Sequence, residues 1–217
     1  MNSIELSRFI EANYPANKTS IANRKPLHGI GLNDADYVTT PTVDGALLSD
    51  PAYTAWFAMM RRAYSQKYHA SRPTYSDITV CKEWHSFRAF RAWWLVNYRE
   101  GYELDKDLLA VGNREYAPGK CIYVPSRLNA FTVDHGADRG ELPIGVCLDK
   151  RSGKYRSDCR NPITGKKHNL GLFATPEAAH ATWLRCKLSL ADQLKPEMDA
   201  IDQRIYPNVV TIIKAAR

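Results

Sequence analysis

The segment from residue 141 to residue 194 constrains the fold most, because three short strand-like runs alternate with turns and lead into a helix. The runs are LPIGVCLD, KYRSDCRN and KKHNLGLF, and the turns between them are KRSGK and PITGK. Glycine and proline in short polar stretches typically mark turns between strands. Thr175 followed by Pro176 is typical of a helix start, since threonine caps the first turn and proline fits the first helical position. The segment therefore predicts a small α+β module of three strands and one helix.

Positive side chains are expected to share one face of the second run. Because successive side chains on a strand point to opposite faces, residues two apart lie on the same side. Lys154, Arg156 and, beyond Asp158, Arg160 therefore fall on one face. The opposite face, expected under the helix, carries Tyr155, Ser157 and Cys159. An exposed basic face of this kind suits a polyanionic partner.

Several spaced features of this segment resemble the Apetala/ethylene-response-factor DNA-binding domain. They are Gly145–Val146, the Lys150–Arg151 turn, Tyr155, the Leu170–Gly171–Phe173 run, and an alanine-rich helix capped by Thr175. In that family the sheet lies in the major groove of double-stranded DNA, a groove wide enough for a small sheet. The resemblance implies DNA-binding roles for Lys150, Arg151, Lys154, Arg156, Arg160, Lys166 and Lys167.

Residues 51–131 carry a second pattern, in which helices precede a strand–strand–helix unit. Asp50 followed by Pro51 predicts the start of a helix. Large apolar residues at helical spacing predict two buried faces. These residues are Tyr53, Trp56, Met60 and Tyr64, and then Trp84, Phe87, Phe90 and Trp94. The second helix also carries Arg88, Arg91 and Arg99 away from this stripe, which predicts a solvated basic face.

A ββα unit is predicted next, with strands over 102–109 and 121–124 and a short helix from Pro125–Ser126. This unit and the helices before it resemble the phage HNH homing endonucleases, in which such nucleases are often joined to Apetala-type domains. The resemblance rests on YTAWFAMMRRAYSQK, TYSDITVCKEWHSF and LDKDLLAVGNREYAPGKCIYVPSRLNAF. In the wider family the ββα unit holds one Mg²⁺ beside a histidine that acts as general base. The resemblance implies Mg²⁺ or Mn²⁺ polarising a scissile phosphate.

The chain departs from that family pattern at its centre, because no histidine occurs between His85 and His135. The candidate catalytic residues are Asp105, Lys106, Asp107 and His85, and the candidate metal ligands are Asp107 and Asn129. Two interpretations stay open. Either these residues form a divalent-ion site for nicking or cutting DNA, or the nuclease site is degenerate and the fold serves as a DNA-binding scaffold.

The two aspartates of the LDKD run bear on that choice. Asp105 and Asp107, two apart on a predicted strand, are expected to face one side, with Lys106 on the other. Such a pair repels unless a cation lies between the carboxylates. This pattern favours a metal ion or an arginine from elsewhere, and the alternative is a solvent-exposed strand edge.

The predicted fold class is α+β, with a helical region leading into the ββα unit and then the three-stranded antiparallel sheet with its helix. The predicted divisions are an arm or cap over 1–50, an HNH-like domain over 51–131, a linker over 132–140, the Apetala-type domain over 141–195, and a C-terminal helix or tail over 196–217. For the tyrosine-bearing part of residues 1–50, a cap over the core is favoured over a flexible arm.

The bulk properties bound the functional classes. The chain has 217 residues, a net charge of +7 and an isoelectric point near 9.1, which favours a polyanionic partner. Its five cysteines show no CxxC spacing, so neither a zinc site nor a disulfide framework is indicated. The N-terminus lacks the apolar run of a signal peptide, and no stretch approaches the roughly 20 apolar residues of a membrane span. These features predict a cytoplasmic protein without a membrane partner, in an infected bacterial host if the phage resemblance holds.

Three functions follow as hypotheses. The first is an HNH-like homing endonuclease with a DNA-reading module. The second is a DNA-binding protein without catalysis, such as a regulator or host-takeover factor on a degenerate nuclease scaffold. The third is an inhibitor that binds a host protein, using the same basic surface on an acidic partner.

Overall fold

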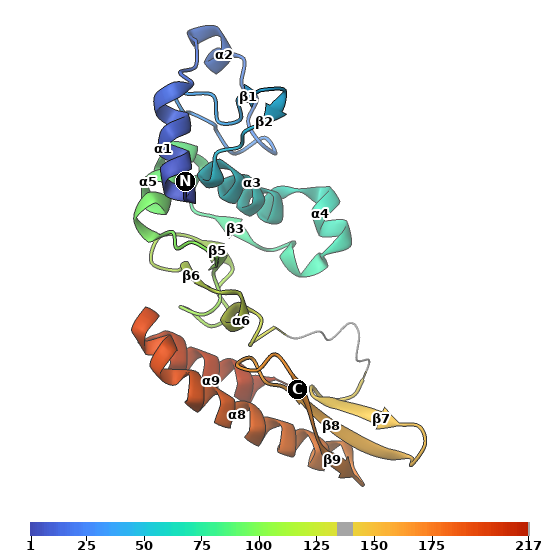
Figure 1. Cartoon of the computed structure of the whole chain (residues 1–217). Helices are drawn as coiled ribbons and strands as arrows, with labels where there is room; N and C mark the ends of the chain where they lie inside the picture. The colour runs from blue at the N-terminus through green and yellow to red at the C-terminus, as the bar shows by residue number, and fades with distance from the viewer. Residues whose placement is uncertain (134–140, 217) are drawn as a thin grey trace. The chain divides into compact units, whose positions relative to one another are not determined.

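The computed structural model describes residues 1–133 and 141–216, and it divides the chain into two compact units of mixed α and β structure (Figure 1). Unit 1 comprises Met1–Asp107 and Gly112–Tyr123, and unit 2 comprises Leu108–Val111 and Val124–Arg217. The α+β class predicted from the sequence is confirmed.

The elements of unit 1 are short and mostly helical. They are α1 (Ser3–Asn13), α2 (Lys18–Ala22), β1 (Thr42–Val43), β2 (Ala46–Leu47), α3 (Pro51–Tyr64), α4 (Gln66–Ser71), η1 (Pro73–Tyr75), β3 (Thr79–Val80), η2 (Lys82–His85), α5 (Phe87–Asn97), β4 (Tyr102–Asp105) and β5 (Glu115–Tyr116). Strand β6 (Ile122–Pro125) pairs with β4, and β3 pairs with β5 in parallel. The strand predicted over 102–109 is shorter in the structure, where β4 ends at Asp105.

The core of unit 1 forms between α3 and α5, as the two apolar stripes predicted. Asp50 caps α3 by accepting a hydrogen bond from the backbone N–H of Ala52 at 2.8 Å, and Pro51 occupies the first turn. Of the first stripe, Trp56 and Met60 of α3 are completely buried, whereas Tyr53 and Tyr64 are half-buried. The second stripe is completely buried, over Trp84, Phe87, Phe90 and Trp94, although Trp84 lies in η2 rather than in the helix predicted to carry it. Burial of these rings supplies the main apolar contribution to the stability of the unit.

The first 50 residues cover this core rather than forming an arm, since Ile10, Ala35 and Tyr37 belong to the buried cluster. Arg91 of α5 holds this N-terminal segment to the core through α1. Its terminal nitrogens donate to the two carboxylate oxygens of Glu11 in α1 at 2.8 and 2.9 Å. Arg91 is only 7% exposed, so its prediction as part of a solvated basic face is wrong. The side chain turns inward because Glu11 and the buried Asp50 both neutralise its charge.

Unit 2 contains the predicted three-stranded sheet and its helix (Figure 1). Its elements are α6 (Ser126–Asn129), β7 (Val146–Asp149), β8 (Lys154–Arg160), β9 (Lys167–Phe173), α8 (Pro176–Ile201) and α9 (Ile205–Ala215). The strands are antiparallel in the order β7–β8–β9. Thr175 caps α8, whose buried Ala179 and Trp183 lie on the side that packs against the sheet. The predicted module is therefore confirmed in topology and in helix start.

The compact units differ from the predicted domain boundaries in two places. Helix α8 continues through Pro196 to Ile201, past the boundary predicted at 195, because its later turns bury Leu194 and Met198 and it packs along α9. Of the predicted ββα unit, β4 belongs to unit 1 whereas α6 belongs to unit 2. The predicted linker at 132–140 lies outside the described residues apart from 132 and 133.

Among the described residues, no helix combines the length and the apolar character that a membrane crossing needs.

Candidate nucleic-acid interface

The outer face of the β7–β8–β9 sheet is the strongest candidate for an interface. On β8, Ser157 is completely buried and Cys159 is 2% exposed, on the face that α8 covers. Lys154 and Arg160 are exposed and Arg156 is half-buried on the opposite face. The alternation predicted from the sequence is confirmed for these residues.

Further positive charges surround that face. Lys167 of β9 pairs in register with Arg160, so the two cations lie side by side at one end of the sheet. The turn between β7 and β8 carries Lys150 and Arg151, and the turn before β9 carries Lys166, all of them exposed. The structure therefore brings all seven predicted DNA-binding residues into unit 2, on the outer face of β8 and β9 or on the turns that flank it.

An aspartate lies in the middle of this basic face. The Asp158 carboxylate is 10% exposed, and its Oδ2 atom lies 3.1 Å from Nε of Arg156 and 2.9 Å from Nζ of Lys167. Burial by itself raises the pKa of Asp158, but the hydrogen bonds and charges of Lys167 and Arg156 outweigh it and hold the pKa below its ordinary value. Sequence reasoning assigned Asp158 no role, although its spacing from Arg156 and Arg160 already placed all three on one face.

A thiol from β7 lies in the same group. Cys147 pairs in register with Arg156, and its Sγ atom lies 3.5 Å from Oδ2 of Asp158. Cys147 is partly exposed, whereas Cys159 on the opposite face is buried. Because Cys147 lies on this face, the reactivity of its thiol should fall when a partner covers the face.

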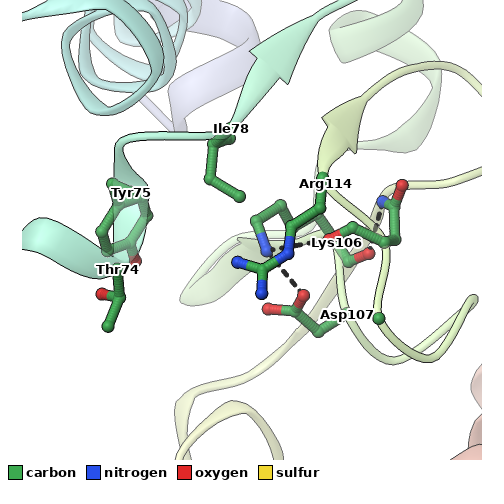
Figure 2. Close-up of a pocket in the computed structure, with 8 residues that line it drawn as sticks. Thr74, Tyr75, Ile78, Lys106, Asp107 and Arg114 are labelled. Atoms are coloured by element: carbon green, nitrogen blue, oxygen red, sulfur yellow. Dashed lines mark hydrogen bonds and ion pairs between the residues drawn. The ribbon is translucent and has the colours of Figure 1, made fainter.

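A polar pocket in unit 1 contains two of the residues predicted to be catalytic. The pocket has a volume of about 260 Å³. Figure 2 shows Lys106, Asp107 and Arg114 on one side of it, with Thr74 and Tyr75 across from them. The Lys106 Nζ atom donates to Asp107 Oδ1 at 2.6 Å and is 3.3 Å from the carbonyl oxygen of Asn113. The pocket thus holds an ion pair rather than a free carboxylate.

The prediction for the LDKD run is wrong in its geometry. Strand β4 ends at Asp105, whose Oδ1 accepts a hydrogen bond at 2.8 Å from the backbone N–H of Asp107. This local turn removes the strand alternation, so Asp105 and Asp107 do not present a pair of carboxylates to one side. Lys106, expected on the opposite face, instead neutralises Asp107 directly.

These contacts do not favour a divalent ion at Asp107, and a metal site there stays a prediction. Magnesium prefers an octahedron of oxygen ligands, whereas the ammonium of Lys106 already occupies one oxygen of this carboxylate. The neighbouring Arg114 adds a second positive charge to the pocket and pairs with Asp77 at 3.2 Å. No group of three or more His, Cys, Asp or Glu side chains able to hold a metal occurs among the described residues.

The remaining two predicted site residues lie elsewhere. His85 ends η2, and its Nε2 lies 3.0 Å from the carbonyl oxygen of Val80 and 3.2 Å from the hydroxyl of Tyr64. These contacts give His85 a structural role in holding α3 to the segment after β3. Asn129 ends α6 in unit 2, so its pairing with Asp107 of unit 1 stays a prediction.

The chain was compared with protein-family models, with curated proteins and with solved structures, and none of them matches it.

Proposed function

We propose that this chain binds double-stranded DNA through the outer face of the β7–β8–β9 sheet. The observation that carries the proposal is the gathering of positive side chains on one face of a small sheet whose other face is closed by α8. Lys154, Arg156 and Arg160 project from β8, and Lys167 joins them from β9. Sequence-independent affinity for DNA comes mainly from such side chains, because they release counterions from the phosphate backbone.

The dimensions of the sheet support a groove-bound arrangement. Three strands spaced about 4.8 Å apart span about 10 Å, and the major groove of B-DNA is about 12 Å wide. The seven residues of β8 extend over about 23 Å at 3.3 Å per residue, comparable with two-thirds of a helical turn. The exposed turns with Lys150, Arg151 and Lys166 would then reach the phosphates on either side.

The resemblance to the Apetala/ethylene-response-factor domain supports the same surface. The order of three antiparallel strands followed by a threonine-capped helix is what that resemblance implies. In that family the sheet faces DNA, and here the sheet face that α8 leaves uncovered is the basic one. The resemblance to HNH nucleases adds DNA as a partner, but the Lys106–Asp107 ion pair gives cleavage no support.

Fluorescence anisotropy with a labelled duplex of mixed sequence tests the proposal. The logarithm of the association constant should fall linearly with the logarithm of salt concentration, with a slope near −0.9 for each phosphate contacted. We expect Arg160→Ala to weaken binding and to reduce that slope by about 1.

Arg185→Ala provides the matched control. Arg185 is exposed on α8, and among the described residues its hydrogen bond goes to Thr182 one turn away, so this variant removes the same charge away from the sheet face. Equal losses for the two variants would refute the assignment of the sheet face. Weak duplex affinity together with a tight complex with one host protein would favour the inhibitor hypothesis instead.

Thiol labelling gives an independent measurement on the unaltered chain. Cys147 lies on the proposed interface, while Cys81 is a partly exposed thiol of unit 1. Duplex DNA should slow the alkylation of Cys147 by iodoacetamide and leave the alkylation of Cys81 unchanged. Peptide mapping by mass spectrometry separates the two sites.

A further inference from the structure

An acidic residue at the centre of a DNA-binding face needs a physical reason. A carboxylate repels the phosphate backbone, so Asp158 by itself lowers affinity for every duplex. Its carboxylate is nevertheless 10% exposed and held at the point where the register between β8 and β9 shifts. The contribution of Asp158 therefore lies in how its carboxylate holds the side chains around it.

The Asp158 carboxylate contacts one side chain from each strand of the sheet. Its Oδ2 atom lies 3.5 Å from Cys147 Sγ on β7, 3.1 Å from Arg156 Nε on β8, and 2.9 Å from Lys167 Nζ on β9. Arg156 donates to Asp158 through Nε, and the Cys147 thiol also lies in hydrogen-bonding contact with the guanidinium. Among the described residues no oxygen atom accepts from the two terminal nitrogens of Arg156, and that side chain is 38% exposed.

This geometry fixes one edge of a planar guanidinium and leaves the other edge available. Arginine carries about 2 kcal/mol of rotamer entropy, and a partner that holds Nε removes much of it before DNA arrives. The two terminal nitrogens then form a fork of parallel donors, which matches the O6 and N7 acceptors of guanine in the major groove.

We propose that Asp158 is a positioning residue that presents the Arg156 fork to a guanine base edge, so that this pair sets sequence preference at one G·C base pair. The inference rests on the proposed DNA-binding function and adds specificity to it. Lys167, held by the same oxygen, is a point charge suited to a phosphate rather than to a base edge.

The test uses the full chain and a pool of synthetic duplexes with a randomised centre, from which the preferred sequence is selected. Two quantities are then measured for each variant. One is the dissociation constant for the unselected pool. The other is the discrimination, defined as the ratio of dissociation constants for the preferred duplex with and without replacement of one G·C pair by A·T.

We expect Asp158→Asn to bind the pool at least as tightly as the parent, because a negative charge is lost. Discrimination at one G·C pair should fall by about tenfold, and Arg156→Ala should lose discrimination at the same pair. In the Arg156→Ala background, Asp158→Asn should cause no further loss of discrimination. Asp149→Asn is the matched control, because it removes the same charge from the same sheet at the end of β7, where Asp149 Oδ1 accepts the backbone N–H groups of Arg151 and Ser152 at 3.0 Å and its hydrogen bonds go to the turn rather than to Arg156. That variant should raise affinity for the pool without changing discrimination.

Melting curves separate positioning from a loss of fold. Should Asp158→Asn prove unfolded, Arg156→Lys serves in its place, since it keeps the charge beside Asp158 but lacks the fork. It should lose the same discrimination while retaining affinity for the pool. Unchanged discrimination in a folded Asp158→Asn variant would overturn the inference. A parent chain that binds duplexes without any G·C preference would also overturn it and leave DNA binding standing, whereas a parent that binds no duplex overturns the proposed function and the inference together.

Discussion

Gly145 supports the packing of α8 beneath the sheet, and replacing it with alanine should destabilise unit 2 strongly. Gly145 precedes β7 with φ +79°, a left-handed conformation that side chains disfavour. A Cβ atom at this position would also lie inside van der Waals contact of the Trp183 ring, only 2.7 Å from its Nε1 atom. The Trp183 ring is 4% exposed and stacks on His180 at a centroid distance of 5.3 Å, so it has little room to move.

The expected magnitude is the sum of two terms. Left-handed backbone costs an L residue about 1–2 kcal/mol, and overpacking a buried ring costs about 1–3 kcal/mol. Gly145→Ala should therefore lower the unfolding free energy of unit 2 by about 2–5 kcal/mol. Gly153→Ala isolates the first term, because Gly153 has φ +67° and no atom of the described residues lies within 4 Å of a Cβ placed there. The control should cost only about 1–2 kcal/mol.

Fluorine NMR of the chain labelled with 5-fluorotryptophan reads the two units separately during urea unfolding. Of the five tryptophans, Trp183 lies in unit 2, and the other four, at positions 56, 84, 93 and 94, lie in unit 1. The midpoint of the Trp183 resonance should fall further in Gly145→Ala than in Gly153→Ala. Equal midpoints for the two variants would refute the close approach of Gly145 to Trp183, and with it the packing of α8 against the sheet.

Three further predictions concern the ion pairs. Arg91→Ala should destabilise unit 1 by about 3–5 kcal/mol, since it leaves buried Asp50 without its cation, whereas Glu11→Gln should cost much less. Urea titrations that rank the two variants in the reverse order would contradict this. Because the folded pKa of Asp158 lies below its unfolded value, its stabilisation is present above about pH 3.9 and is lost as the pH falls through the folded pKa; melting curves of Asp158→Asn should accordingly show a weaker acid dependence than the parent. Because Nζ of Lys106 pairs with the Asp107 carboxylate, Mg²⁺ or Mn²⁺ should leave the melting temperature unchanged, and plasmid DNA should stay uncut with either ion as it does with EDTA. Nicking that disappears in Asp107→Ala and Asn129→Ala would restore the nuclease hypothesis.

Local patterns in the sequence determined much of the fold of both units. The helix start at Asp50 and the start of α8 at Thr175 were predictable because a cap depends on residues only two or three positions apart. The exposed basic face of β8 was predictable for a similar reason, since strand alternation has a period of two residues. The buried stripes of α3 and α5 follow from the helical period alone.

Tertiary structure decided the roles of the charged residues. Arg91 looked solvated by its position on the helix, but it is buried because Glu11, 80 residues away in the chain, comes to meet it. Asp107 was expected beside Asp105 on one face of a strand, but a turn at Asp105 ends the strand and places Lys106 against Asp107. Asp158 acquired its partner Lys167 only through the register between β8 and β9. Charge pairing depends on which distant segments meet and in which register, and a helical or strand period along one segment carries no information about that.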